Sequence, residues 1–365
     1  MQIQFIFFLV LVTSGLAAAQ VKPLSAGAEA TVLEKLGPRL RAPRAAAELV
    51  PAVREAITLA RVRADPRYLG QAQALIGERW SQADAGYDLL TLQATIEQSR
   101  HEFAQARTTL QMAVKSPAPS HAQAWLTLAT IERVQANYPA ATQACQSIKE
   151  VVAQLYASVC LLETQSLQGQ FEGARAGYQQ ILSTARLPAQ QAWIYSLMAE
   201  NELRAGLPAA ALRLFALSLA LDNDSYTALA YAETLLAMQQ ANAALTVLDM
   251  QPESDAVLIR RAQAYIQLKD PRLPALQATL TSRLAASSLR SENSGHLREQ
   301  AMLALHVQAD ARAALALAKR NLELQREPLD WLIAVHSAER AGDAQEKAKL
   351  LQAAAQTGLK DARLK

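Results

Sequence analysis

The five histidines are the first side chains to test for chemistry, because imidazole serves both as a metal ligand and as a general base. They are His101, His121, His296, His306 and His336. None lies four positions from another histidine, and no HExxH, CxxC or mixed Cys/His spacing occurs. The G-x-S-x-G turn and the loop that ends in Gly-Lys-Ser/Thr are also missing. We therefore expect no metal, no cofactor and no enzymatic activity.

A glycine run is the next candidate, because glycine-rich loops can cradle phosphate groups. The stretch GQFEGARAGYQQIL, residues 169–182, carries Gly169, Gly173 and Gly177. No strand pattern precedes these glycines and no lysine follows them, as a phosphate loop would require. We expect Gly169 in a turn and the other two within a helix, at a point that is either soft or closely packed.

The chain opens with a segment that resembles a secretory leader, and the structural elements are expected after it. Residues 1–19 carry no charge and pass from an apolar core into Ala17-Ala18-Ala19, which is the outline of a secretory signal peptide. Its amino terminus lacks a Lys or Arg, so an uncleaved anchor stays open as an alternative. We expect cleavage after Ala19, export to the periplasm of a bacterium and no stable membrane insertion afterwards.

Composition points to helices. Alanine supplies 75 of the 365 residues, whereas glycine and proline supply 13 and 14. This balance favours helix over sheet. The formal net charge is +3, and the basic residues are scattered among 33 acidic ones, so we expect no nucleic-acid partner.

A pattern of small and large apolar residues repeats every 31 to 38 positions. Its anchor is an alanine, which recurs at Ala72, Ala106, Ala141, Ala174, Ala210, Ala244, Ala275, Ala313 and Ala348. A large apolar residue stands four positions later in most copies, and an apolar residue, usually alanine, stands twelve positions earlier. Spacings of three and four share one helical face, and the twelve-residue step reaches back across a turn to the preceding helix. Each unit is therefore predicted to be a helical hairpin.

These hairpins resemble tetratricopeptide repeats (TPRs). Gly169, Phe171, Ala174, Tyr178 and Ile181 stand at the offsets of that motif, and the resemblance covers about nine units between residues 53 and 361. It implies an all-α fold, a right-handed superhelical solenoid of antiparallel helix hairpins. It also implies a concave groove, lined by the first helix of each hairpin, that binds peptides or proteins.

The two cysteines, Cys145 and Cys160, fall within this pattern. One lies late in a second helix and the other early in the next helix, so antiparallel packing would bring them level. An oxidising compartment favours a disulfide between them. A buried free thiol at Cys145 is the alternative, because other repeats place a large apolar residue there.

The resemblance also suggests which side chains line the groove. They are the first-helix positions that the packing stripe leaves free: Arg61, Gln98, Arg133, Tyr195, Glu202, Tyr226, Glu233 and Arg260. Both charges and tyrosine occur among them, which suits a protein or peptide surface.

The sequence thus divides into a signal peptide (1–19), a leading segment with a helix (20–52), the repeat array (53–361) and a tail (362–365). We expect an exported scaffold or adaptor that binds a protein or peptide of unknown identity. A structural subunit of an envelope assembly or polysaccharide-export machine is an alternative. An enzyme or a carbohydrate-binding protein that uses the groove is a remote one. The oligomeric state stays open.

Overall fold

Paired helices make up the described part of the chain. The computed structural model describes residues 46–288 and 296–365, and within them there are eighteen α-helices and no strand. The first helices of the pairs are α1 (Ala46–Val62), α3 (Tyr87–Ser99), α5 (Ala122–Val134), α7 (Gln154–Leu167), α9 (Pro188–Arg204), α11 (Ser225–Ala237), α13 (Asp255–Leu268), α15 (Leu297–His306) and α17 (Pro328–Arg340). The second helices are α2 (Arg67–Ile76), α4 (Phe103–Ala113), α6 (Tyr138–Gln146), α8 (Phe171–Leu182), α10 (Pro208–Leu221), α12 (Ala241–Leu248), α14 (Leu273–Ser288), α16 (Ala311–Leu324) and α18 (Ala344–Gln356). These nine pairs confirm the predicted all-α solenoid.

Two short 3-10 helices, η2 (Gly77–Arg79) and η3 (Val151–Ala153), lie in the connections between pairs. The signal peptide predicted over residues 1–19 lies outside the described residues, as does most of the leading segment. The first described helix begins at Ala46, seven residues before the expected start of the repeat array.

Alanine lets the two helices of a pair approach each other. Ala106 of α4 and Ala94 of α3 are both fully buried in one core cluster, and Ala141, Ala174 and Ala244 are fully buried at the matching position of later second helices. A methyl group at the contact permits close packing, while Leu110, Tyr178 and Leu248 fill the space one turn further on.

Each hairpin turns through one residue with a positive φ angle. These residues are Ala64, His101, Ala136, Gly169, Gly206, Gln239, Lys269, Ala309 and Gly342. The next backbone N–H donates to a carbonyl in the last turn of the first helix, as Gln170 donates to Gln165 and Asp343 to Ala338. This arrangement ends a helix by supplying donors for carbonyls that the helix itself leaves unpaired. The turn predicted at Gly169 is confirmed, and Gly206 and Gly342 hold the equivalent position in later hairpins.

The predicted register holds in the early hairpins and fails in later ones. Ala211, not Ala210, is the buried alanine of α10, because α9 has 17 residues where α5 and α11 have 13. Likewise Ala314 rather than Ala313 is buried in α16. Ala275 and Ala348 are exposed, and Leu280 and Leu350 are buried on those helices instead.

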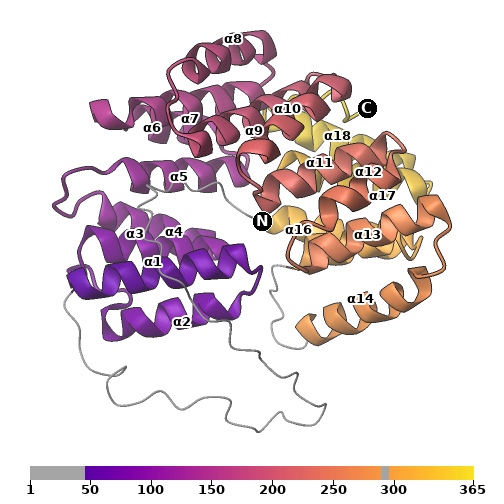
Figure 1. Ribbon diagram of the computed structural model, residues 1–365, viewed down its shortest axis with the longest axis horizontal. Helices are drawn as coiled ribbons and strands as arrows, with labels where there is room; N and C mark the ends of the chain where they lie inside the picture. The colour runs from indigo at the N-terminus through magenta and orange to yellow at the C-terminus, as the bar shows by residue number, and fades with distance from the viewer. Residues whose placement is uncertain (1–45, 289–295) are drawn as a thin grey trace, which may run out of the picture.

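The end of the chain packs against its middle. Figure 1 shows the C-terminal helices α16, α17 and α18, in yellow, behind α9 and α11 rather than at a free end of the array. The backbone N–H groups of Arg326, Lys360 and Ala362 donate to the carbonyls of Val134, Leu167 and Arg204 at 2.7, 2.9 and 2.8 Å. One core cluster joins Tyr138 and Leu167 to Leu359. The superhelix is therefore closed by a contact between its third to fifth pairs and its end.

Candidate functional site

Three glutamates occupy the same position on three successive first helices. Glu163, Glu200 and Glu233 each stand four residues before the last residue of α7, α9 and α11. Glu163 and Glu200 are near enough to repel each other, which adds to the raised pKa of Glu163. We call these three residues the acidic column.

Each carboxylate of the acidic column has its own arginine. Arg133 Nη2 lies 2.9 Å from Glu163 Oε2, Arg204 Nη1 lies 3.4 Å from Glu200 Oε2, and Arg260 Nη2 contacts Glu233 Oε2. The arginine side chains are 9, 3 and 6% exposed, whereas the glutamates are 19, 15 and 31% exposed. In every pair the carboxylate is the group that is left more accessible to a ligand.

A tyrosine links neighbouring helices within this row. Tyr226 of α11 donates its hydroxyl hydrogen to Glu200 Oε1 of α9 at 2.5 Å. Burial raises the pKa of Tyr226, and the charge of Glu200 raises it further. Burial also raises the pKa of the Glu163 carboxyl, and the Arg133 guanidinium opposes that effect. Removing carboxylates from water in this way strengthens their attraction for cations.

The structure brings half of the predicted groove residues to this row. Arg133, Tyr226, Glu233 and Arg260 belong to it, by the contacts just described. Tyr195 lies on α9, partly exposed, at the edge of the core cluster that contains Tyr178. Binding of a partner by any of them stays a prediction.

Two of the predicted groove residues are packing residues instead. Gln98 is fully buried, and neither its amide nitrogen nor its amide oxygen has a hydrogen-bond partner among the described residues. Glu202 is buried under Arg175 of α8, which donates to both carboxylate oxygens at 2.8 and 2.7 Å. The physical reason is angular, since one residue of register rotates a side chain by about 100° around the helix.

Arg61 lies near the end of α1. Its charge lowers the pKa of Asp222, although burial outweighs this and the pKa of that carboxyl is raised.

The sequence prediction missed Glu163 and Glu200. Each stands six residues before the turn residue of its hairpin, Gly169 and Gly206, and Glu233 stands six before Gln239. Alignment on the turns, rather than on the buried alanines, would have shown the acidic column.

The cysteines lie next to the acidic column. A disulfide joins Cys145 of α6 to Cys160 of α7, and both residues are buried. Arg133 Nη1 lies 3.4 Å from Cys160 Sγ, while its Nη2 contacts Glu163. The bond ties two successive pairs together at the arginine that orients the first carboxylate of the column.

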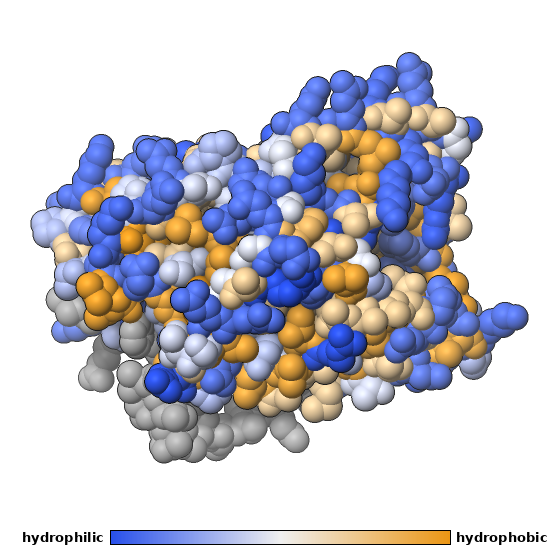
Figure 2. Space-filling model, turned by 90° about the horizontal axis from the view of Figure 1, so that it is seen from above, coloured by the Kyte–Doolittle hydropathy of each residue, from blue (hydrophilic) through white to orange (hydrophobic). Residues whose placement is uncertain are grey.

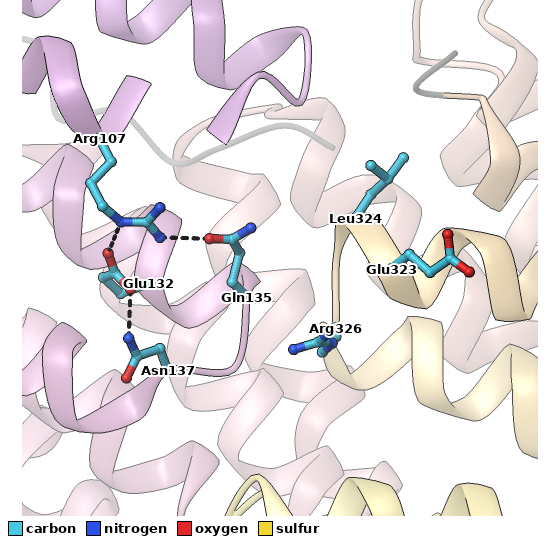
Figure 3. Close-up of a pocket in the computed structure, with 7 residues that line it drawn as sticks. All are labelled: Arg107, Glu132, Gln135, Asn137, Glu323, Leu324 and Arg326. Carbon is cyan, nitrogen blue, oxygen red and sulfur yellow. Dashed lines mark hydrogen bonds and ion pairs between the residues drawn. The ribbon is translucent and has the colours of Figure 1, made fainter. Parts of the chain in front are cut away.

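A polar pocket of about 250 Å³ lies where the superhelix closes. Figure 3 shows Arg107 and Asn137 on either side of Glu132, with Gln135 beside them and Arg326 extending from the opposite wall. Arg107 donates to Glu132 and Gln135, both at 2.6 Å, and Asn137 donates to Glu132 at 2.9 Å. These groups satisfy one another, so we assign the pocket to the closing contact.

The outer surface mixes polar and apolar residues. Figure 2 shows hydrophilic residues in blue interspersed with hydrophobic ones in orange across the face seen from above. None of the described helices is long and apolar enough to cross a membrane. In the part of the chain that the structure describes, no three His, Cys, Asp or Glu side chains are grouped to hold a metal ion.

Comparison with known proteins shows the fold. No protein-family model matches this sequence, and no curated protein does. The structure is similar to that of a Rap protein complexed with competence and sporulation factor, with a TM-score of 0.54 at 9% identity over 90% of this chain and 89% of that one.

More distant likenesses have lower TM-scores. A tetratricopeptide repeat protein from Parabacteroides merdae gives 0.39 at 11% identity, over 80% of this chain and 98% of that one. PilF of Pseudomonas aeruginosa gives 0.40 at 19% identity, over 57% and 95%. The likeness with the TM-score of 0.54 and the nine helix pairs show an all-α helical-repeat fold, as the repeat pattern predicted.

Proposed function

We propose that this protein is a binding scaffold whose inner surface holds a peptide or protein segment that carries basic side chains. The observation that carries the proposal is the acidic column, in which the accessible member of each ion pair is the carboxylate. A basic side chain could share each carboxylate with its resident arginine, and charged hydrogen bonds of this kind are among the stronger ones. The proposal includes no catalytic step.

The fold supports this use. Helical repeats build a long curved surface from contacts between neighbours, and successive first helices present equivalent positions along it. The Rap protein with a similar fold was solved in complex with competence and sporulation factor. We extend from that likeness only the idea that such a superhelix can hold a ligand.

The binding test compares labelled nine-residue peptides that are basic, neutral or acidic, by fluorescence anisotropy at two salt concentrations. We expect the basic peptide to bind and Glu200→Gln to weaken it by about tenfold, the equivalent of roughly 1.4 kcal/mol for one charged contact. Glu172→Gln removes the same charge from an exposed side chain of α8 and serves as the matched control. Equal losses in both variants, or equal binding of the acidic peptide, would reject the proposal.

We further propose that the protein is exported. The support is the uncharged apolar leader with its small-residue step, together with a cysteine pair suited to an oxidising compartment. Amino-terminal sequencing of the protein recovered from a periplasmic extract should begin at Gln20. Recovery only from the cytoplasm, with Met1 retained, would contradict export.

A further inference from the structure

Three successive first helices end in carbonyl groups that the rest of the chain uses. The last carbonyls of a helix have no partner within the helix. Val134, Leu167 and Arg204 are the final residues of α5, α7 and α9, and each accepts a backbone N–H from the C-terminal part of the chain. We call this row of carbonyls the carbonyl edge.

The chain after α18 binds two of the three carbonyl groups of the carbonyl edge. This C-terminal segment, residues 358–364, donates from Lys360 to Leu167 and from Ala362 to Arg204, two positions apart in the segment and one hairpin apart in the edge. Between α18 and these contacts Leu359 is almost fully buried, in the cluster that contains Tyr138 and Leu167. The contact thus combines backbone hydrogen bonds with one apolar anchor.

Glycine at two hairpin turns makes room for the segment. A Cβ atom at Gly169 would lie 2.8 Å from Lys360 Cγ, and one at Gly206 would lie 3.1 Å from the Cβ of Ala362. At Gly342, in a turn of the same conformation, a Cβ would meet nothing within 4 Å. At the two turns that face the segment, glycine is therefore favoured by the close approach of the segment as well as by the positive φ angle.

The segment is also held in shape by its own side chains. Asp361 accepts from the backbone N–H of Arg363 at 3.0 Å and from its guanidinium at 2.9 and 2.6 Å. The N–H of Leu364 closes a turn onto the carbonyl of Asp361. Such local bonds lower the entropy lost when a short peptide is ordered on a surface.

We propose that the carbonyl edge is a docking site for a short peptide segment, and that the C-terminal segment of this chain is its resident occupant. In place, the segment closes the superhelix by joining its middle to its end. Released, it frees the edge and lets the two parts separate. A competing segment needs an apolar residue at the position of Leu359 and free N–H groups at the positions of Lys360 and Ala362. This site adjoins the acidic column, since the charges of Glu233 and Glu200 contribute to the raised pKa of Arg363 in the segment. Its defining contacts are the backbone hydrogen bonds to Leu167 and Arg204, which do not require a ligand on the column.

The first test uses the full chain with Leu359→Asp, which places a charge in an apolar site and should release the segment. The probe is a fluorescent peptide of residues 357–365, TGLKDARLK. A tethered segment has an effective concentration of the order of millimolar, so it should keep micromolar peptide from the wild-type edge. We expect the peptide to bind the variant at least about tenfold more tightly than it binds wild type or the control Lys365→Asp.

Two further arms separate this site from the acidic column. A scrambled peptide of the same composition carries the same charge and should not bind. A peptide N-methylated at the positions of Lys360 and Ala362 also keeps the charge but lacks both N–H donors, so its binding to the Leu359→Asp chain should be at least about tenfold weaker. Equal binding of the N-methylated and the unmodified peptide would place the peptide on the acidic column and overturn the docking site. Equal binding to wild type and to the variant would overturn resident occupancy.

A second pair of variants tests the contact if Leu359→Asp does not fold. Gly206→Ala and Gly342→Ala carry similar backbone strain, with φ angles of 82° and 73°, but only the first presses on the segment. Hydrogen exchange at Lys360 and Ala362 should be about tenfold faster in Gly206→Ala than in Gly342→Ala. Equal exchange in the two variants would overturn the proposal, as would a wild-type dimer that exchanges its segments between copies.

Discussion

Arg298 shows what a buried charge requires at the scale of one residue. From α15 it donates to both carboxylate oxygens of Asp330, at 2.7 and 2.8 Å, and to Glu327 at 2.6 Å. Asp330 is completely buried and also accepts from Asn321. Burying these charges is tolerable only because each has a partner.

Arg298→Met should therefore lower the free energy of unfolding by about 3–5 kcal/mol, because it leaves Asp330 buried without its counterion. Urea denaturation followed by circular dichroism measures this. Arg283→Met is the matched control, since Arg283 also binds two carboxylates but at the surface. Arg283→Met should lower the free energy of unfolding by no more than about 1 kcal/mol. Similar losses at the two sites would contradict the assigned role of burial.

The disulfide belongs to the same scale. Cys145 and Cys160 are 15 residues apart, and a crosslink over a loop of that length stabilises a fold by about 3 kcal/mol in the chain-entropy model. Reduction should lower the free energy of unfolding by roughly that amount. Thiol titration of the unfolded, unreduced protein should find no reactive thiol. Two reactive thiols would contradict the bond.

At the scale of one helix, the two glycines inside α8 occupy different kinds of position, one open and one closely packed. Gly173 and Gly177 both lie inside α8, where glycine weakens a helix. A Cβ at Gly173 would meet nothing within 4 Å, whereas one at Gly177 would lie 2.4 Å from Leu162 Cδ2 of α7. The two alternatives that the sequence left open, a soft point and a closely packed one, thus apply to different residues.

Gly173→Ala should raise the free energy of unfolding by about 0.5–1 kcal/mol through helix propensity alone. The free energy of unfolding of Gly177→Ala should be lower than that of Gly173→Ala by about 1 kcal/mol or more, because the added methyl group displaces Leu162. The two variants form a matched pair on one helix and are compared by their urea midpoints. A gain at Gly177 equal to that at Gly173 would show that the α7–α8 contact is looser than described.

Closure changes how the whole molecule should unfold. In an open array each repeat contacts only its neighbours, so the ends can fray independently. Here Lys360 and Ala362 join the end of the chain to α7 and α9. Hydrogen exchange in α17 and α18 should therefore have a free energy close to that of α7 and α9. Fast exchange of α17 and α18, with slow exchange in the middle, would show that the closing contact adds no cooperativity.

Much of the fold follows from short stretches of sequence. The alanine pattern of Ala106, Ala141 and Ala174, and the glycines at the turns, depend on residues within one hairpin, so local periodicity suffices to find them. The prediction for Ala210 was wrong because α9 is a turn longer than its counterparts, which lengthens the spacing between buried alanines. Ala211 stands five residues after the turn residue Gly206, as Ala174 stands five after Gly169, so alignment on the turns gives the register. Gln98 and Glu202 were assigned to the groove from the family resemblance, and an error of one residue in such an assignment turns a side chain by about 100° around the helix.

By itself, the sequence determined nine helical hairpins, the turn at Gly169 and the level placement of Cys145 and Cys160, because each of these depends on neighbours within one or two repeats. Only the tertiary structure decided that the C-terminal segment reaches the carbonyl edge and closes the superhelix. Val134 and Arg326 are about 190 positions apart, as are Leu167 and Lys360. Such contacts depend on the rotation accumulated over several repeats, and small differences in helix length alter that sum.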